Sequence, residues 1–360
     1  MAKKIVPGRG ASPKRKSAGS VQTMHDVARL AGVAVSTVSA VINGTAKVSV
    51  ERTKRVHDAM RTLRYHPDQI ARSLKVGRSN IIGVIVPDIT NPFYPEVIRG
   101  IEGEARRHGY EVLLCDSNED AGREKEYLGA LSSRRVDGAI LACSDSSAAY
   151  GRLVHRRFPL VFVDRIPRRE RHNAVSTDNV KAAYLGTRHL IDLGHKRLAV
   201  LAGDLGLSTH AARLEGFKKA MQEARLPVND EYLRCGNLQI EDGYEAGMEL
   251  LTLKRPPTAV LASNNKLLLG LLRALTELRV SCPEQVSVVG FDDHVWNQHF
   301  NPKLTSIAQP TYEIGKCAFD LLLARMEHKP SPRAKTVVLL DAELKIRESS
   351  GPPAETAESS

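Results

Sequence analysis

The sequence lacks long apolar runs, clustered cysteines and an export signal. No apolar stretch approaches the roughly 20 residues that cross a bilayer, which argues against a membrane-spanning helix. The basic stretch from Met1 to Ser20 has no apolar centre, so it does not resemble a secretory signal. The five cysteines are odd in number and have no CxxC spacing. Reduced thiols are therefore favoured over a disulfide or metal framework, and we expect a cytosolic protein.

The sequence also lacks the motifs of several enzyme classes. It contains no phosphate-binding GxxxxGK[ST], no zinc-binding HExxH and no GxSxG with a nucleophilic serine, and no GxGxxG follows a predicted strand. The twelve histidines show no metal-ligand spacing. These absences predict a protein without catalytic activity, cofactor or bound metal. The first alternative to this prediction is that the protein is an enzyme.

The positive charge of the chain is concentrated in its first quarter. Residues 1–80 hold 16 Lys and Arg against four acidic residues, a net of +12, whereas the whole 360-residue chain carries +11. The remaining 280 residues therefore carry −1. Such a partition favours a surface for a polyanion such as DNA over a merely solvated basic face. The length predicts two or three domains.

Three short helices are predicted in residues 21–66. Thr23 and Asp26 form a capping-box-like start for the first helix. A glycine turn leads to a second helix over about Val35 to Asn43, and Ser49 is the expected N-cap of the third helix. Two helices joined by a tight turn predict a helix-turn-helix whose second helix presents small polar side chains to a major groove. An ordinary three-helix core is the alternative.

One long motif in this region identifies a family. The stretch TMHDVARLAGVAVSTVSAVING at residues 23–44, followed by Val48-Ser49 and by YHPDQIARSLK at residues 65–75, resembles the signature of the LacI/GalR (lactose-repressor) family of bacterial regulators. The likeness continues to about Arg347. It implies a homodimer on a near-palindromic operator in double-stranded DNA. The residues expected to bind DNA are Thr23, Val35, Ser36, Thr37, Ser39, Ala40, Asn43, Ser49, Arg72, Leu74 and Lys75.

Two positions depart from the family pattern. Ala34 stands where the family usually has serine, so the second helix lacks its usual cap, a loss on the order of 1 kcal/mol unless Ser36 substitutes. Ala40 stands at a base-reading position where the family often has arginine or histidine. Alanine makes no hydrogen bond there, although it can touch a thymine methyl. The operator sequence is therefore left open.

The segment over residues 67–80 is expected to connect the head to the rest of the chain. Pro67 suits a first helical position, but about nine residues make too short a helix to persist alone in water. The resemblance implies a hinge helix that folds when two copies pair over the minor groove, with Leu74 wedged between base pairs. A simple linker is the alternative. The basic tail over residues 1–20 is expected to be disordered.

Residues 81–348 alternate short apolar strand candidates with amphipathic helices. This alternation predicts parallel sheets covered by helices on both faces. The expected fold is an N-terminal all-α helix-turn-helix head plus an α/β two-lobed periplasmic-binding-protein-like sensor with two doubly wound parallel sheets. The resemblance implies that the chain crosses between the lobes near Gln309 and Val338, so that the lobes comprise residues 81–178 with 309–337 and residues 179–308 with 338–348. A disordered tail is expected over residues 349–360. The resemblance implies that tetramers use a leucine-heptad tail, and because this tail has no such pattern a dimer is favoured.

Polar residues follow the predicted strands of both lobes, where doubly wound sheets bind ligands. Carboxylates, amides and a guanidinium suit a hydroxyl-rich ligand, and an aromatic ring suits its apolar face. Arg213 and Asp292 match effector-binding positions of the family, and we expect Arg213 in the first turn of its helix. Many strand-end residues instead cap helices, an alternative that applies above all to Ser208 and Thr209. The effector-binding candidates are Phe93, Tyr94, Asp164, Thr209, Arg213, Asn264, Asp292 and Gln309.

The class of effector is less constrained by the sequence. Positive charge in the cleft from Arg165, His210 and Lys266 would favour a sugar acid or sugar phosphate over a neutral sugar. The equal alternative is that all three side chains are solvated. Leu261 stands where some purine-responsive relatives stack an aromatic ring, which argues against a purine. The predicted function is a sequence-specific transcriptional regulator, with repression as the family's usual outcome, controlled by a small sugar-like effector. A periplasmic-type sugar-binding protein is the alternative.

Overall fold

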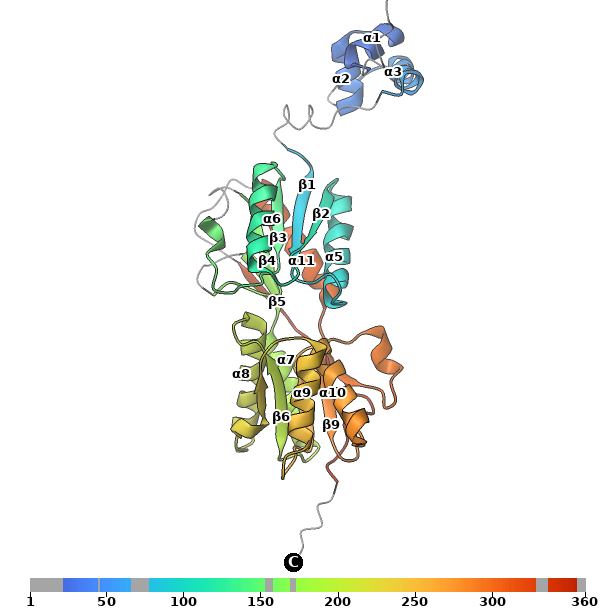
Figure 1. Cartoon of the computed structure of the whole chain (residues 1–360). Helices are drawn as coiled ribbons and strands as arrows, with labels where there is room; N and C mark the ends of the chain where they lie inside the picture. The colour runs from blue at the N-terminus through green and yellow to red at the C-terminus, as the bar shows by residue number, and fades with distance from the viewer. Residues whose placement is uncertain are drawn as a thin grey trace, which may run out of the picture. The chain divides into compact units, whose positions relative to one another are not determined.

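The computed structural model describes residues 22–44, 46–65, 78–152, 158–168, 173–327 and 336–354. The chain divides into two compact units, Met1–Gly77 and Arg78–Ser360. The predicted basic tail and the predicted hinge residues Arg72, Leu74 and Lys75 lie outside the described residues. Figure 1 shows the three helices of the first unit and the two lobes of the second unit.

The first unit, called the head below, contains α1 (Met24–Ala31), α2 (Val35–Asn43) and α3 (Val50–Leu63). The capping box predicted for α1 is present, since Thr23 and Asp26 hydrogen-bond to each other's backbone N–H. Gly32 ends α1 in the left-handed region at φ +63°. The axes of α1 and α2 bend by 105°, within the range of helix-turn-helix motifs.

The starts of α2 and α3 are weakly capped. Ala34 has the extended backbone of an N-cap but makes no side-chain hydrogen bond to the helix. Ser49 is the N-cap of α3, as predicted, yet its side chain makes no capping hydrogen bond. Among the described residues, no single helix is long and apolar enough to cross a membrane; α1 and α2 pass that test only as a bent pair, by length and composition.

The first lobe of the second unit contains a six-stranded sheet in the order β11-β5-β4-β3-β1-β2, with all neighbours parallel. Side chains of α5 and α11 form a core with one face of this sheet, and α6 packs on the other face. The elements are β1 (Ile81–Val86), α5 (Phe93–Arg107), β2 (Glu111–Asp116), α6 (Ala121–Ser133), β3 (Gly138–Leu141), β4 (Leu160–Val163), β5 (Asn173–Thr177), α11 (Thr311–Glu327) and β11 (Val337–Leu340).

The second lobe repeats this plan with the order β12-β10-β9-β8-β6-β7, in which only β12 is antiparallel to its neighbour. Here α7 and α8 share a core with one face, and α9 and α10 pack on the other. The elements are α7 (Asn179–Asp192), β6 (Leu198–Gly203), α8 (Ser208–Glu223), β7 (Leu233–Cys235), α9 (Ile240–Leu251), β8 (Ala259–Ala262), α10 (Asn265–Leu278), β9 (Ser287–Phe291), β10 (Thr305–Ala308) and β12 (Glu343–Lys345).

Two expected boundaries near the C-terminus are wrong. The second lobe was expected to resume at Val338, but β11 pairs with β5 through Leu340, so the chain leaves the first lobe only after that residue. Residues 349–354 were expected to be disordered, but the Ser349 carbonyl accepts from Val288 N at 2.7 Å. The Gly351 carbonyl accepts from Ser287 Oγ at 3.0 Å. The ends of these segments are set by long-range pairing, which local sequence patterns do not reveal.

Candidate effector site and DNA-binding head

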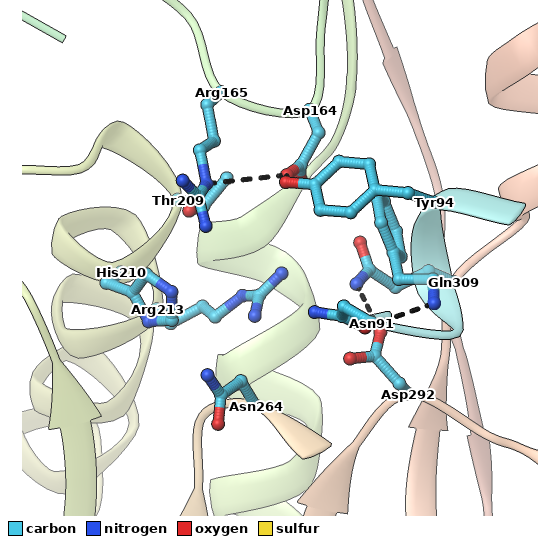
Figure 2. Close-up of a pocket in the computed structure, with 11 residues that line it drawn as sticks. Asn91, Tyr94, Asp164, Arg165, Thr209, His210, Arg213, Asn264, Asp292 and Gln309 are labelled. Carbon is cyan, nitrogen blue, oxygen red and sulfur yellow. Dashed lines mark hydrogen bonds and ion pairs between the residues drawn. The ribbon is translucent and has the colours of Figure 1, made fainter. Parts of the chain in front are cut away.

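A small cavity of about 30 Å³ lies between the two lobes, where strands from both sheets end. All eight predicted effector-binding residues line it, which places side chains from distant parts of the chain around one space (Figure 2). Three further lining residues, Asn91, Arg165 and His210, were not among the eight candidates. Arg165 and His210 had been named only as sources of positive charge in the cleft, and Asn91 lies in the loop between β1 and α5.

The first lobe contributes an aromatic and acidic wall. The Tyr94 hydroxyl donates to Asp164 Oδ2 at 3.0 Å, and the Phe93 and Tyr94 rings meet edge to face with centroids 5.1 Å apart. Asp164 lies directly after β4 with φ +60°, a conformation that non-glycine residues rarely adopt. Burial raises the pKa values of both the Asp164 carboxyl and the Tyr94 phenol. This side of the cavity therefore offers a ligand the carboxylate of Asp164 as a hydrogen-bond acceptor, held in place beside an aromatic ring.

The second lobe contributes a buried arginine. The Arg213 side chain is 4% exposed and extends from α8 toward the centre of the cavity. Its Nε donates to Asn179 Oδ1 at 2.7 Å, its Nη1 donates to the Ser263 carbonyl at 2.5 Å, and its Cζ lies 4.0 Å from the Phe291 ring centroid. Because α8 begins at Ser208, this arginine lies in the second turn and not in the first turn as expected. Burial lowers its pKa.

Asp292 and Gln309 form the opposite side of the cavity. Gln309 Nε2 donates to Asp292 Oδ1 at 2.7 Å, and Gln309 Oε1 accepts from Thr177 Oγ1 at 2.6 Å. Asp292 follows β9 with φ +70°, so each sheet presents one strained aspartate to the cavity. These contacts hold the carboxylate in one orientation, as recognition of a specific hydroxyl pattern requires.

The alternative that residues after strands cap the following helices fails for α8 but applies to α10. Ser208 and Thr209 do not cap α8, because its N-cap is Leu207 and has no side-chain cap. Ser208 instead joins the lobes: its Oγ accepts from Ile166 N at 2.9 Å. Asn264, an effector candidate, lines the cavity and also caps α10 by accepting from Leu267 N at 2.7 Å. The side-chain oxygen of Asn264 is therefore engaged by the start of α10.

The expected excess of positive charge in the cleft is not present. Arg165 forms a two-point ion pair with Glu119 at 2.6 and 2.9 Å. Lys266 does not line the cavity and pairs with Asp88 at 2.6 Å. Burial, with Arg213 nearby, lowers the pKa of His210 well below its usual value, so this ring is neutral near pH 7. Each of the three cationic candidates is thus paired or uncharged, which the sequence pattern did not show.

Leu261 does not carry the argument drawn from it against a purine. It lies in β8, is fully buried and packs in the core between α7 and the sheet. It is absent from the residues that line the cavity. Its aliphatic character therefore reports on packing and does not discriminate between effector classes.

Direct hydrogen bonds between the lobes lie beside the cavity. Asn265 Nδ2 donates to Asn91 Oδ1 at 2.9 Å, and Lys266 Nζ meets Asp88 Oδ2 at 2.6 Å. The Ser208 backbone N–H also donates to Ser146 Oγ at 3.3 Å. Together with the small volume of the cavity, these contacts define a closed cleft.

The DNA-binding candidates of the head lie on and beside α2. Val38 is fully buried against the other two helices, whereas Ser36 is exposed and Val35, Thr37, Ser39, Ala40 and Asn43 are half-buried. Asn43 Nδ2 donates to the Ser39 carbonyl at 2.8 Å, so this side chain is partly engaged within the helix. Thr23 and Ser49 are exposed at the starts of α1 and α3. The outward face of α2 thus carries small polar side chains.

The two units match two descriptions of known protein families. Residues 23–68 match "Bacterial regulatory proteins, lacI family", and residues 79–342 match "Periplasmic binding proteins and sugar binding domain of LacI family". A helix-turn-helix head joined to a lobed ligand-binding unit defines an effector-controlled transcriptional regulator that binds DNA. The chain belongs to the LacI family.

Individual relatives support this assignment over most of the chain. The HTH-type transcriptional repressor PurR of Vibrio vulnificus is 36% identical over 328 residues, which cover 91% of this chain and 98% of that protein. A crystal structure of the lac repressor dimer bound to operator and the anti-inducer ONPF has a TM-score of 0.83 at 28% identity, covering 92% and 100% of the two chains. A LacI family regulator from Enterococcus faecium with bound ribose has a TM-score of 0.67 at 33% identity, covering 76% and 99%.

Proposed function

We propose that the protein is a homodimeric repressor whose head binds a near-palindromic operator and whose affinity for it is set by a small, uncharged, hydroxyl-rich effector such as a monosaccharide. The observation that carries this proposal is the composition of the cavity lining, in which two aspartates, two guanidinium groups, amides and an aromatic pair meet between the lobes. Carboxylates accept from hydroxyl groups, guanidinium and amide groups donate to them, and a ring contacts the C–H face of a sugar.

The charge of the cavity favours a neutral sugar over the sugar acid suggested by the sequence. Asp164 and Asp292 offset Arg213 and Arg165, and Glu119 pairs with Arg165 from outside the lining. The Enterococcus faecium relative has bound ribose, which is a neutral sugar, and this supports the inference. Because these groups read as hydroxyl-binding partners and not as an acid/base pair, we propose binding without turnover.

In the proposed mechanism, effector binding and cleft closure are coupled. A ligand that binds the closed sensor better than the open one shifts the population toward it, and a reciprocal coupling of about 1–3 kcal/mol to operator affinity is typical. The predicted hinge over residues 67–75, with Leu74 as the expected wedge, would transmit that shift to the paired heads. A regulator of this kind acts on the chromosome, so we expect a cytoplasmic protein.

Selection of duplexes from a random pool, followed by binding titrations at fixed moderate salt, tests the DNA arm of the proposal. We expect a near-palindromic consensus bound at least 1,000-fold more tightly than random duplex, the lower end for specific regulators. Binding without sequence preference, with or without small molecules, would contradict it. Replacement of Leu74 by alanine is expected to weaken operator binding, and unchanged affinity would remove the wedge.

Thermal-shift screening of the purified chain against sugars, sugar acids and nucleobases tests the effector arm. A ligand at 100 times its Kd stabilises the sensor by about 2.7 kcal/mol, which is readily measured. We expect stabilisation by a neutral sugar, and that sugar should alter operator affinity. Stabilisation by a nucleobase or a sugar acid alone would contradict the proposed effector class.

A further inference from the structure

The cavity-lining residue Arg165 forms an ion pair with Glu119, a residue that does not itself line the cavity. Glu119 lies in the loop between β2 and α6, and its carboxylate meets both terminal nitrogens of Arg165, Oε2 to Nη1 at 2.6 Å and Oε1 to Nη2 at 2.9 Å. Arg165 lines the cavity with a side chain only 6% exposed, whereas Glu119 does not line it and is 34% exposed. The cavity lining therefore contains a guanidinium whose positive charge is already compensated by a carboxylate outside the lining.

The loop that presents Glu119 is held in a rare conformation. Asn118 and Glu119 are consecutive non-glycine residues with φ of +52° and +58°. Such residues persist in the left-handed region only where the surroundings hold them. Ser117 N donates to the Val86 carbonyl at 2.9 Å, and Glu119 N donates to the Pro87 carbonyl at 2.7 Å. Asp120 caps α6, which fixes the other end of the loop. The backbone therefore aims Glu119 at Arg165.

Resting on the proposed function, we propose that Glu119 is a specificity-determining residue that makes the cavity accept neutral polyols and reject their anionic counterparts. A guanidinium that is free on its fork side binds carboxylates and phosphates at two points. Glu119 occupies that fork. An anion in the cavity therefore meets Asp164 and Asp292, which offset Arg213, while the charge of Arg165 is compensated by Glu119. The remaining N–H groups of Arg165 donate to hydroxyl oxygens of a neutral ligand.

The test compares the full-length protein with Glu119→Gln, which keeps the shape and removes the charge. Binding is measured by calorimetry at constant ionic strength with two matched pairs, D-galactose with D-galacturonate and D-ribose with D-ribose 5-phosphate. In E119Q we expect at least tenfold tighter binding of a charged member and less than threefold change for its neutral partner. An unchanged preference in E119Q, or a wild-type protein that binds a charged member as tightly as its neutral partner, overturns the proposal.

The matched control is Glu102→Gln. Glu102 pairs with Arg106 at 2.7 Å on the exposed side of α5, so this variant removes the same charge from the same lobe without touching the cavity. It should retain wild-type selectivity. A gain of anion binding in E102Q equal to that in E119Q would show that net charge alone is responsible and would overturn the proposal.

A second probe separates this inference from the sugar proposal. If the wild-type protein binds neither member of either pair, those sugars are excluded as effectors, but inorganic phosphate still tests Glu119. Phosphate, compared with chloride at equal ionic strength, should raise the melting temperature of E119Q more than that of the wild type. The double variant E119Q/R165Q should lose this gain. Equal responses in all three proteins overturn the role of Glu119.

A further variant with a shorter side chain keeps the proposal testable if E119Q does not fold. Glu119→Asp keeps the charge but shortens the side chain, which weakens the two-point pair. It should show the same direction of change with a smaller gain for the charged ligands. Wild-type selectivity in a folded E119D, where E119Q is not recovered folded, overturns the proposal.

Discussion

The head and the sensor differ most in the size of their cores and in what those cores hold. The buried residues in the described part of the head form one cluster, made of Val27, Ala28, Ala31, Val38, Val56 and Ala59. The sensor has four larger clusters on the two faces of two sheets. Between its lobes it also buries Arg165, Arg213, Asp164 and Asp292. Small domains have little stability to lose, whereas a large core can hold paired charges.

Removal of one core side chain should therefore affect the head most strongly. Val56→Ala empties a fully buried position in α3 and should cost about 2 kcal/mol, a large part of the stability of so small a unit. We expect operator affinity to fall more than tenfold while the sensor keeps its melting transition. Calorimetry and DNA titration measure both. Val50→Ala, at an 87% exposed position of the same helix, is the control. A joint loss of both transitions would contradict independent units.

A buried charge in the sensor should matter for binding and not for the head. Arg213→Ala removes the hydrogen bonds to Asn179 and Ser263 and the contact with Phe291. Effector affinity is expected to drop about 100-fold or more, equivalent to about 2.7 kcal/mol, with operator binding in the absence of effector unchanged.

The control for Arg213 is another stacked arginine. Arg273 lies 4.0 Å from the Tyr244 ring centroid but is half exposed on the surface. Arg273→Ala should leave the effector response intact. A normal response in Arg213→Ala would remove this side chain from the effector site.

An added methyl group should cost more stability where α11 packs closely on α5 than at an open position of α6. A Cβ on Gly315 in α11 would lie 2.0 Å from the Val97 carbonyl oxygen of α5, so Gly315→Ala must move one helix. A loss of about 1–3 kcal/mol is expected in denaturant unfolding. Gly129→Ala in α6 meets nothing within 4 Å and should be neutral or stabilising by up to about 1 kcal/mol. Equal effects would contradict the close packing of α5 and α11.

The smallest expected effect is a gain in the head. Ala34 already has the extended backbone of an N-cap, with φ −68° and ψ 151°, but has no side chain to accept from the first turn of α2. Ala34→Ser should stabilise the head by about 1 kcal/mol and raise its melting temperature by several degrees. The sensor should be unaffected. A lower melting temperature of the head would show that serine cannot cap α2 there.

Local signals in the sequence predicted the head better than the connections of the sensor. The capping box at Thr23 and Asp26 and the glycine turn are short-range features, and both are present. The alternation of strands and helices also predicted two parallel sheets. By contrast, β7 and β12 have three residues each, and β12 joins its sheet through antiparallel pairing with β10. Boundaries that depend on such pairing were misplaced.

The candidate site shows the same division at the level of residues. Strand ends meet at one edge of a doubly wound sheet, so the eight effector candidates could be chosen from spacing and resemblance before any coordinates. The net charge of the cavity could not be predicted in this way. Arg165 and His210 look alike as cleft cations in the sequence, yet Arg165 pairs with Glu119, whereas burial lowers the pKa of His210.

The sequence alone determined the class of the protein, because caps, periodicity, charge partition and a long motif are properties of neighbouring residues. Tertiary structure decided what kind of ligand the cavity suits. Glu119 and Arg165 are 46 residues apart and Asp88 and Lys266 are 178 apart, so these pairs form only after the sheets and lobes assemble. Burial then sets the protonation of His210, since a charged group is stable in the interior only with a partner.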